Sequence, residues 1–212
     1  MALWKAKQQG INIVHMVNFI NTDTVRTMSH GLQDESIVMQ AEALGLPLLQ
    51  QKVTWDTYEA GFKESMNYLK HRGITGLVTG DICLLEHIDW IEGVCGESGM
   101  QVARPLWNID RLQLINEFVQ NDFKAVVVNV KADLLDKEWV GRQIDNKFID
   151  DLQQVALEKQ IDMCGETGEF HTFVYDGPVF NRSIHMGTTS MVRRGDRWFL
   201  QIADFSLNEK AQ

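Results

Sequence analysis

The densest group of reactive side chains in this sequence lies in one segment of eight residues. It reads Gly165-Glu166-Thr167-Gly168-Glu169-Phe170-His171-Thr172. Two carboxylates this close raise each other's proton affinity, which suits proton transfer or the binding of a cation. An imidazole such as that of His171 accepts or donates a proton near neutral pH. The segment is therefore a candidate site, and a solvated turn before a hairpin is the alternative interpretation.

A second candidate lies at Gly80-Asp81, directly after an apolar run that predicts a strand over 74–79. In a parallel sheet, ligands bind beyond the carboxyl ends of the strands. Gly80 lets the backbone approach a ligand closely, and the carboxylate of Asp81 suits a magnesium ion or a ribose hydroxyl. A plain turn from strand to helix is the alternative, and the dipeptide alone favours it.

Two further residues carry weaker signals. His30 lies in a polar loop, where a histidine more often packs than binds. Arg142 precedes a predicted helix, and its planar guanidinium suits a phosphate or a carboxylate. A surface ion pair with Asp145 or Asp151 explains Arg142 equally well.

Strands and helices alternate through the first half of the chain and must position these groups. Apolar runs predict strands over 11–20, 48–53, 74–79 and 102–104. Apolar residues three and four apart predict helices over 2–9, 34–44, 58–69 and 85–95. This alternation is typical of a parallel sheet covered by helices.

The second half has a different pattern. It predicts helices over 112–119 and 146–159, with Asp145 as N-cap of the latter, and a buried strand over 125–130. After Cys164, alternating residues and turns at 176–178 and 195–196 predict hairpins. We therefore expect a domain boundary near residue 107, which separates residues 1–107 from 108–212.

Composition excludes several classes of protein. The 212 residues are 44% hydrophobic and 23% charged, which is typical of one large or two small globular domains. A net charge of −9 without a basic patch disfavours a nucleic acid partner. No apolar run reaches the roughly 20 residues that cross a bilayer, and the first residues do not form a signal peptide. Three widely spaced cysteines predict neither disulfides nor a zinc site, so we expect neutral thiols in a reducing, cytoplasmic compartment.

Several segments together resemble one family. They are Arg26-Thr27-Met28-Ser29-His30-Gly31-Leu32, the run 40–48, Thr79-Gly80-Asp81-Ile82, Pro105-Leu106-Trp107, Trp139-Val140-Gly141-Arg142 and the run 165–172. The last is similar to a Glu-Gly-Gly-Glu-Tyr/Phe-His-Thr motif, with Thr167 in place of the first glycine. In this order, over about residues 2–180, the segments resemble the diphthine–ammonia ligases, a family of PP-loop ATP pyrophosphatases.

The resemblance implies a fold and a reaction. The implied fold is α/β, with a parallel-sheet domain like the adenine nucleotide α-hydrolases over 1–107 and a smaller α+β substrate-side domain over 108–212. The implied reaction uses ATP with Mg²⁺ to adenylate a carboxylate, after which ammonia displaces AMP to give an amide. In this family the carboxylate is that of diphthine on elongation factor 2, so ATP, ammonium and that factor are the implied partners. A homodimer is left open.

The resemblance also implies binding residues. On the nucleotide side these are Asn18, His30, Gly80 and Asp81. On the substrate side they are Arg142, Glu166, Thr167, Gly168, Glu169, His171 and Thr172. Acidic groups there suit the cationic trimethylammonium of diphthine. We assign no metal site and no catalytic base, and we expect the two sets to converge on one cleft at the tips of parallel strands.

Two departures from the family pattern affect the expected activity. The family begins with a strand and an SGGxDS loop before the segment that Ala2-Leu3-Trp4-Lys5-Ala6 resembles. We therefore expect this strand and its phosphate-binding loop to be missing, with little release of AMP from ATP. The family also has an arginine in the helix after Gly80-Asp81, where Ile88 and Trp90 stand here.

Two other functions stay open. One is a PP-loop enzyme that acts on transfer RNA or a small metabolite, although the low positive charge and the lack of paired CxxC motifs disfavour the RNA version. The other is a catalytically silent paralogue that binds a nucleotide or a protein. Binding of ATP without turnover would distinguish the silent paralogue from an enzyme.

Overall fold

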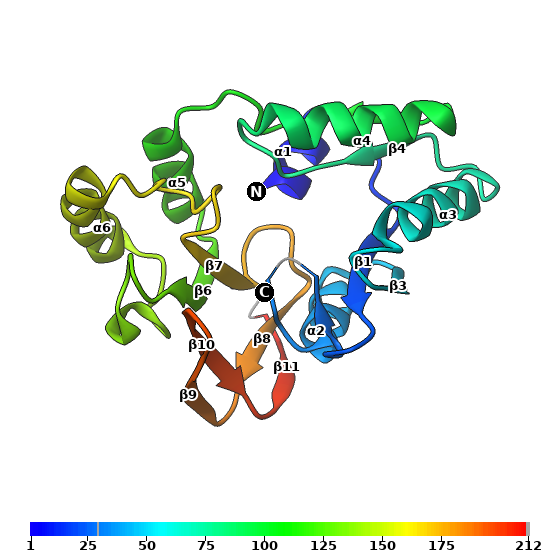
Figure 1. The fold of residues 1–212 in the computed structure, drawn as a ribbon. Helices are drawn as coiled ribbons and strands as arrows, with labels where there is room; N and C mark the ends of the chain where they lie inside the picture. The colour runs from blue at the N-terminus through cyan, green and yellow to red at the C-terminus, as the bar shows by residue number, and fades with distance from the viewer. Residues whose placement is uncertain (29, 211–212) are drawn as a thin grey trace. The chain divides into compact units, whose positions relative to one another are not determined.

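The structure, a computed structural model, describes residues 1–28 and 30–210 and divides into two units (Figure 1). Unit 1 comprises Met1–Ser29 and Leu46–Ile109, and unit 2 comprises His30–Gly45 and Asp110–Gln212. The main division after Ile109 lies close to the boundary expected near residue 107. The segment His30–Gly45, which we placed in the first domain, belongs to unit 2.

Unit 1 is a mixed α/β unit with two small parallel arrangements of strands. Its elements are α1 (Ala2–Gln8), β1 (Met16–Asn21), β2 (Arg26–Thr27), β3 (Leu48–Val53), α3 (Tyr58–Lys70), β4 (Gly76–Val78), α4 (Leu85–Glu97) and β5 (Gln101–Ala103). β1 is parallel to β3, and β4 is parallel to β5. β2 pairs antiparallel with the end of β1. The predicted α/β class with parallel strands is confirmed.

The core of unit 1 forms between two helices and the strands they cover. In α3, Phe62, Met66 and Leu69 are buried, at the helical spacing that the sequence predicted. They pack in one cluster with buried residues of α4, among them Ile91 and Cys95. Strands β1, β3, β4 and β5 supply the partly buried residues against this cluster. Apolar stripes of this kind supply most of the stability of amphipathic helices.

Unit 2 combines helices with antiparallel strands. Its elements are α2 (Asp34–Leu44), α5 (Arg111–Gln120), β6 (Lys124–Lys131), η1 (Lys137–Trp139), α6 (Asn146–Lys159), β7 (Phe170–Asp176), β8 (Arg182–Met186), β9 (Thr189–Arg194), β10 (Arg197–Ile202) and β11 (Phe205–Glu209). Four strands form a sheet in the order β7-β6-β10-β9, and β11 pairs with β8. The predicted hairpin at 195–196 is confirmed, because β9 pairs antiparallel with β10. The turn at 176–178 does not form a hairpin, because β7 and β8 belong to different sheets.

A bulge in β6 decides where its buried polar residue, Asn129, points. Val127 packs in a cluster with residues of α5 and α6, whereas Val126 and Val128 pack in a second cluster with Leu32. The pairing with β7 shifts between Val127 and Asn129. A bulge reverses the alternation of side chains. Asn129 is thereby turned to the side of the second cluster and is buried there with only 3% of its surface exposed.

Helix α6 begins as the sequence predicted. The side chain of Asp145 accepts a hydrogen bond from the backbone N–H of Phe148 at 2.7 Å, which confirms it as the N-cap. Among the helices of residues 1–28 and 30–210, none is both long and apolar enough to pass through a membrane.

Candidate functional site

The turn between α6 and β7 places Glu169 in the interior of unit 2. Gly165 and Gly168 have positive φ angles of +71° and +84°. A Cβ atom on Gly165 would lie 2.6 Å from the carbonyl oxygen of Phe170, so the backbone closes tightly there. The turn ends at Glu169, of which only 4% is exposed. The predicted segment therefore does more than turn the chain, because it buries a carboxylate.

The two oxygens of the Glu169 carboxylate have different surroundings. Oε1 accepts hydrogen bonds from the backbone N–H of Asp162, at 3.0 Å, and from the hydroxyl of Thr167. Oε2 is buried and has no hydrogen-bond partner among the described residues. A buried carboxylate oxygen without a donor is costly. It is therefore the atom of this site best suited to receive a ligand.

Asp162 fixes the shape of the same turn. Its Oδ1 accepts from the backbone N–H of Cys164 at 2.7 Å, and its Oδ2 pairs with Arg111 Nε at 3.0 Å. Burial first, and the charge of Asp162 second, raise the pKa of the Cys164 thiol to about 12. This thiol is neutral at physiological pH, as we expected, and it is not a nucleophile.

Arg197 of β10 ties the turn to the sheet. Its Nη2 donates to the carbonyl oxygen of Gly168 at 2.8 Å, and its Nε donates to Asn129 Oδ1 at 2.6 Å. Asn129 in turn donates from Nδ2 to the carbonyl oxygen of His30 at 3.2 Å. Burial lowers the pKa of Arg197, and nearby carboxylates, including Glu169, oppose this shift. A positive charge is thus held beside the turn by two hydrogen-bond acceptors, one of which, Asn129, is itself anchored to His30.

Two histidine rings complete this side of unit 2. The ring of His171 lies edge-on to that of His30, with 4.9 Å between the ring centroids. Burial, and then the charges of His30, Arg197 and Lys131, lower the pKa of His171 to about 3. His171 is therefore uncharged at neutral pH, which favours a role in hydrogen bonding over proton transfer there. We call Glu169, Asp162, Thr167, Arg197, Asn129 and His171 the Glu169 cluster.

The remaining substrate-side residues lie near the cluster or apart from it. Glu166 is partly buried, and its N–H lies 3.5 Å from Asp162 Oδ1. Thr172 is opposite Val127 in the pairing of β7 with β6.

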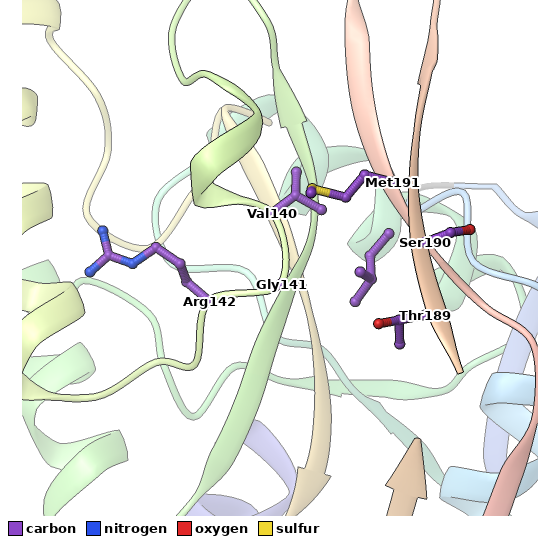
Figure 2. A pocket seen from close by; sticks show the side chains of 7 residues that line it. Val140, Gly141, Arg142, Thr189, Ser190 and Met191 are labelled. Carbon is purple, nitrogen blue, oxygen red and sulfur yellow. The ribbon is translucent and has the colours of Figure 1, made fainter. Parts of the chain in front are cut away.

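Arg142 is held elsewhere in unit 2. Its Nη2 pairs with Asp151 Oδ2 at 2.6 Å, and its guanidinium lies over the ring of Trp139, 4.5 Å from the centroid. Figure 2 shows its side chain pointing away from Val140 and Met191. The surface ion pair that the sequence left open is therefore what the structure has.

In unit 1, Asp81 follows β4 and makes one specific contact. Its Oδ1 lies 3.0 Å from Nδ1 of His87, and its side chain is 13% exposed. Burial, and then the charge of Asp81, raise the pKa of Tyr58. Gly80 is exposed beside it. The strand-end position that the sequence predicted for Gly80-Asp81 is thus observed.

Three buried polar atoms of unit 1 have no hydrogen-bond partner among the described residues. They are Asn18 Oδ1 on β1, His15 Nδ1 just before it and Thr79 Oγ1 just after β4. Buried polar atoms are rarely left unpaired unless water or a ligand completes their hydrogen bonds. Asn18, which the resemblance placed on the nucleotide side, is one of the three.

The structure groups the predicted residues by unit. Glu169, Thr167 and His171 lie in unit 2 together with His30, which we had expected on the nucleotide side. Gly80-Asp81 and Asn18 lie in unit 1. The expected convergence of the two sets on a single cleft stays a prediction. Ser29 of the resembling segment lies outside the described residues.

Sequence reasoning missed four residues of this network, namely Arg111, Asn129, Asp162 and Arg197. Only Asn129 carried a signal, because it is the one polar residue inside the run Ala125–Val130. A polar side chain inside a buried strand must find a hydrogen-bond partner. The other three are charged residues in ordinary positions for loops, helix starts and strand ends.

Comparison with known proteins gives matches along most of the chain. Residues 1–102 match the diphthamide synthase N-terminal domain, and residues 110–207 match the diphthamide synthase C-terminal domain. The chain is 24% identical to the diphthine–ammonia ligase of Bos taurus over 183 residues, which cover 79% of the chain and 68% of that protein. The corresponding protein of Danio rerio is 24% identical over 214 residues, covering 91% and 84%.

The diphthine–ammonia ligase of Schizosaccharomyces pombe is longer. It is 24% identical over 192 residues, which cover 82% of the chain but 32% of that protein. None of these matches tests the expected lack of the SGGxDS loop, which stays a prediction.

Proposed function

The chain belongs to the diphthamide synthase family, and from this premise we propose that the protein is an ATP-dependent amide ligase. The proposal is carried by one observation: both domains of the family match, in order, along residues 1–102 and 110–207. The relatives are named for diphthine and ammonia, and we extend both substrates to this protein, with elongation factor 2 as the carrier of diphthine. We also propose that unit 1 has an adenine nucleotide α-hydrolase-like fold and that the protein works in the cytoplasm.

The proposed reaction has two steps. In the first, an oxygen of the substrate carboxylate attacks the α-phosphorus of ATP, so that an acyl adenylate forms and pyrophosphate leaves. In the second, the lone pair of ammonia attacks the acyl carbon, an amide forms, AMP leaves and one proton is released. The protein contributes by holding the two reactants in line, which lowers the entropic part of the barrier.

On the nucleotide side we propose Asp81, Gly80 and Asn18. Mg²⁺ in ATP-dependent enzymes is held by one or two carboxylates together with phosphate oxygens. The described residues hold no group of three or more His, Cys, Asp or Glu side chains that suits a metal ion, so a cage made by the protein alone does not fit. The single carboxylate of Asp81 does fit a Mg²⁺ ion carried by the nucleotide. When bound, that ion neutralises charge on the phosphates.

On the substrate side we propose Glu169 as the main contact, with Glu166, Thr167, Gly168, His171 and Thr172 around it. The unpaired Oε2 of Glu169 suits the trimethylammonium group of diphthine, because a buried negative charge attracts a cation strongly. The low pKa of His171 supports this assignment, since an uncharged ring does not repel a cation. The His30 ring packs against the ring of His171. Arg142 would have to leave Asp151 before it binds substrate.

The nucleotide products test this proposal. The purified protein would be incubated with ATP, ammonium and elongation factor 2 that carries diphthine, and the products would be separated by anion-exchange chromatography. Because the phosphate-binding loop is expected to be missing, we expect slow turnover. The AMP and pyrophosphate that form should appear in equal amounts, with formation dependent on both ammonium and the modified factor. Release of ADP and phosphate would contradict the ligase chemistry. Binding of ATP without any product would support the catalytically silent paralogue instead.

A pair of variants connects the reaction to the Glu169 cluster. Glu169→Gln removes the buried negative charge and keeps the shape of the side chain, so we expect the KM for the modified factor to rise at least about tenfold. Glu158→Gln is the matched control, because Glu158 is an exposed residue of α6. Equal KM values for both variants would show that Glu169 does not bind the substrate.

A further inference from the structure

The four-stranded sheet of unit 2 splits at one end of β10. β10 pairs with β9 along its whole length, from Arg197 to Ile202, but it pairs with β6 only from Arg197 to Phe199. Beyond that point β6 bonds to the segment 141–144 instead. Gly141 N–H donates to the carbonyl of Val127 at 2.8 Å, and Val127 N–H donates to the carbonyl of Arg142 at 2.9 Å. A fork therefore opens between this segment and the outer hairpin of β9 and β10.

A hollow of about 330 Å³ lies at this fork (Figure 2). Its lining residues are Val140, Gly141, Arg142, Thr189, Ser190, Met191 and Leu200. Figure 2 shows the side chain of Met191 reaching from β9 toward Val140, while the guanidinium of Arg142 is turned away. Leu200 is opposite Met191 in the pairing of the hairpin. The hollow thus has an apolar wall and the hydroxyl group of Thr189 at one side, while the Ser190 hydroxyl is turned away.

The hollow borders an open strand edge. β9 is the last strand of the sheet order, and all but one of its residues are exposed. The two-residue turn at Gly195-Asp196 makes Arg194 and Arg197 a hydrogen-bonded pair, so the N–H groups of Met191 and Arg193 face the free edge. Half of Met191 is exposed on this edge. An open edge beside a side-chain pocket is the arrangement by which a sheet takes up an extended peptide.

Charge indicates what kind of peptide would pair there. Arg193 and Arg194 are exposed at the turn end of β9 and lie over the rings of Trp198 and Phe199, at 5.7 and 5.8 Å from the ring centroids. Neither forms an ion pair with a carboxylate of residues 1–28 or 30–210. The chain as a whole has a net charge of −9, so two arginines without an ion pair at successive positions, one on each face of β9, are a local exception. They would attract an acidic segment and repel a basic one.

We propose that β9 is a docking edge for an extended acidic segment of a partner protein. The segment would pair with the backbone of β9, place one apolar side chain in the hollow beside Met191, and set its acidic residues near Arg193 and Arg194. This surface lies outside the Glu169 cluster and does not depend on the proposed reaction. It would be a means of recognising a protein partner through its backbone, with side chains adding selectivity.

Direct binding tests this proposal. The probe is a fluorescein-labelled peptide with a single valine among glutamates, so that acidic side chains lie on both faces of the extended chain. A peptide with lysine at each glutamate position serves for comparison. We expect saturable binding of the acidic peptide by fluorescence anisotropy, about tenfold or more tighter than the basic one. Hydrogen exchange of the backbone N–H groups of Met191 and Arg193 should slow when the acidic peptide is bound.

Variants separate the parts of the interaction. Met191→Pro removes an N–H group of the free edge, where proline is tolerated, and should abolish binding. Met191→Ala keeps that N–H group and should weaken binding only in part. The double change Arg193→Glu and Arg194→Glu should reverse the preference between the two peptides. Arg72→Glu, an exposed arginine of unit 1, is the matched control and should leave binding unchanged.

Three results would overturn the proposal. The first is a lack of saturable binding of the acidic peptide. The second is evidence against one part of the contact: equal binding of both peptides would leave Arg193 and Arg194 out of it, and binding that survives Met191→Pro would leave the edge out of it. The third is a dimer in sedimentation velocity that Met191→Pro converts to monomer, because the edge would then serve a second copy of this chain.

Discussion

Replacing Glu169 in two ways separates its role in the fold from its role at the site. In Glu169→Gln, the amide oxygen can accept the two hydrogen bonds that Oε1 accepts now, from Asp162 N–H and from the Thr167 hydroxyl. The amide NH₂ then takes the place of Oε2, which is already buried and unpaired. In Glu169→Ala, both donors lose their acceptor and a cavity opens beside them.

The structure gives a magnitude for each change. Each donor left unpaired in the interior costs about 1–3 kcal/mol, so we expect Glu169→Ala to lower the free energy of unfolding by about 3 kcal/mol or more. In Glu169→Gln the loss of two charge-assisted bonds is offset by relief of a buried charge, so the change should stay within about 1 kcal/mol. The charge at the site is lost in both variants.

Urea unfolding followed by tryptophan fluorescence measures the stabilities of the two variants. The formation of AMP and pyrophosphate with the modified factor measures their function. We expect Glu169→Gln to unfold near the wild-type midpoint and yet to bind the modified factor poorly. If Glu169→Gln is as unstable as Glu169→Ala, the carboxylate serves the fold. If Glu169→Gln retains wild-type activity, the proposal that Oε2 of Glu169 contacts the substrate is refuted.

Three further predictions follow from the geometry. The pKa of His171 is about 3 in the folded protein and ordinarily 6.5, so as the pH falls the unfolded chain binds this proton first and the free energy of unfolding should fall between pH 6.5 and 3. In thermal unfolding measured at a series of pH values, His171→Gln should make this fall smaller. Gly165→Ala should lower the free energy of unfolding more than Gly168→Ala. Both glycines have a positive φ, but only a Cβ atom at position 165 would clash with Phe170. A difference under about 0.5 kcal/mol between the two variants would contradict this. Asp81→Asn should lower the pKa of the partly buried Tyr58 phenol in ultraviolet titration, since the charge of Asp81 now helps to raise it. An unchanged titration would contradict this electrostatic influence.

Local structure was largely predictable from the sequence. The helices over 34–44 and 146–159 and the strand over 48–53 begin and end where apolar spacing, Gly45 and the Asp145 cap indicated. The first strand is shorter than predicted: residues 11–15 lie outside it and β1 starts at Met16, where the pairing with β3 begins. Hydrophobicity alone does not show at which residue the pairing with a neighbouring strand begins.

The site was predictable in part. The crowded run from Gly165 to Thr172 identified Glu169 and its turn, because glycines and acidic residues at that density are uncommon before a strand. Its partners Asp162 and Arg197 lie before the run and on a later strand, and only the folded sheet brings them to it. The neutral state of His171 also depends on burial, which the sequence does not show.

Transfer of nitrogen from ammonium to the diphthine carboxylate is the event on which the proposed function depends. It can be followed with ¹⁵N-labelled ammonium, ATP and the modified elongation factor, with the product peptide examined by mass spectrometry. The account predicts one labelled nitrogen in each amidated residue, formed together with one AMP. ATP consumption while all of the label remains in ammonium would contradict it.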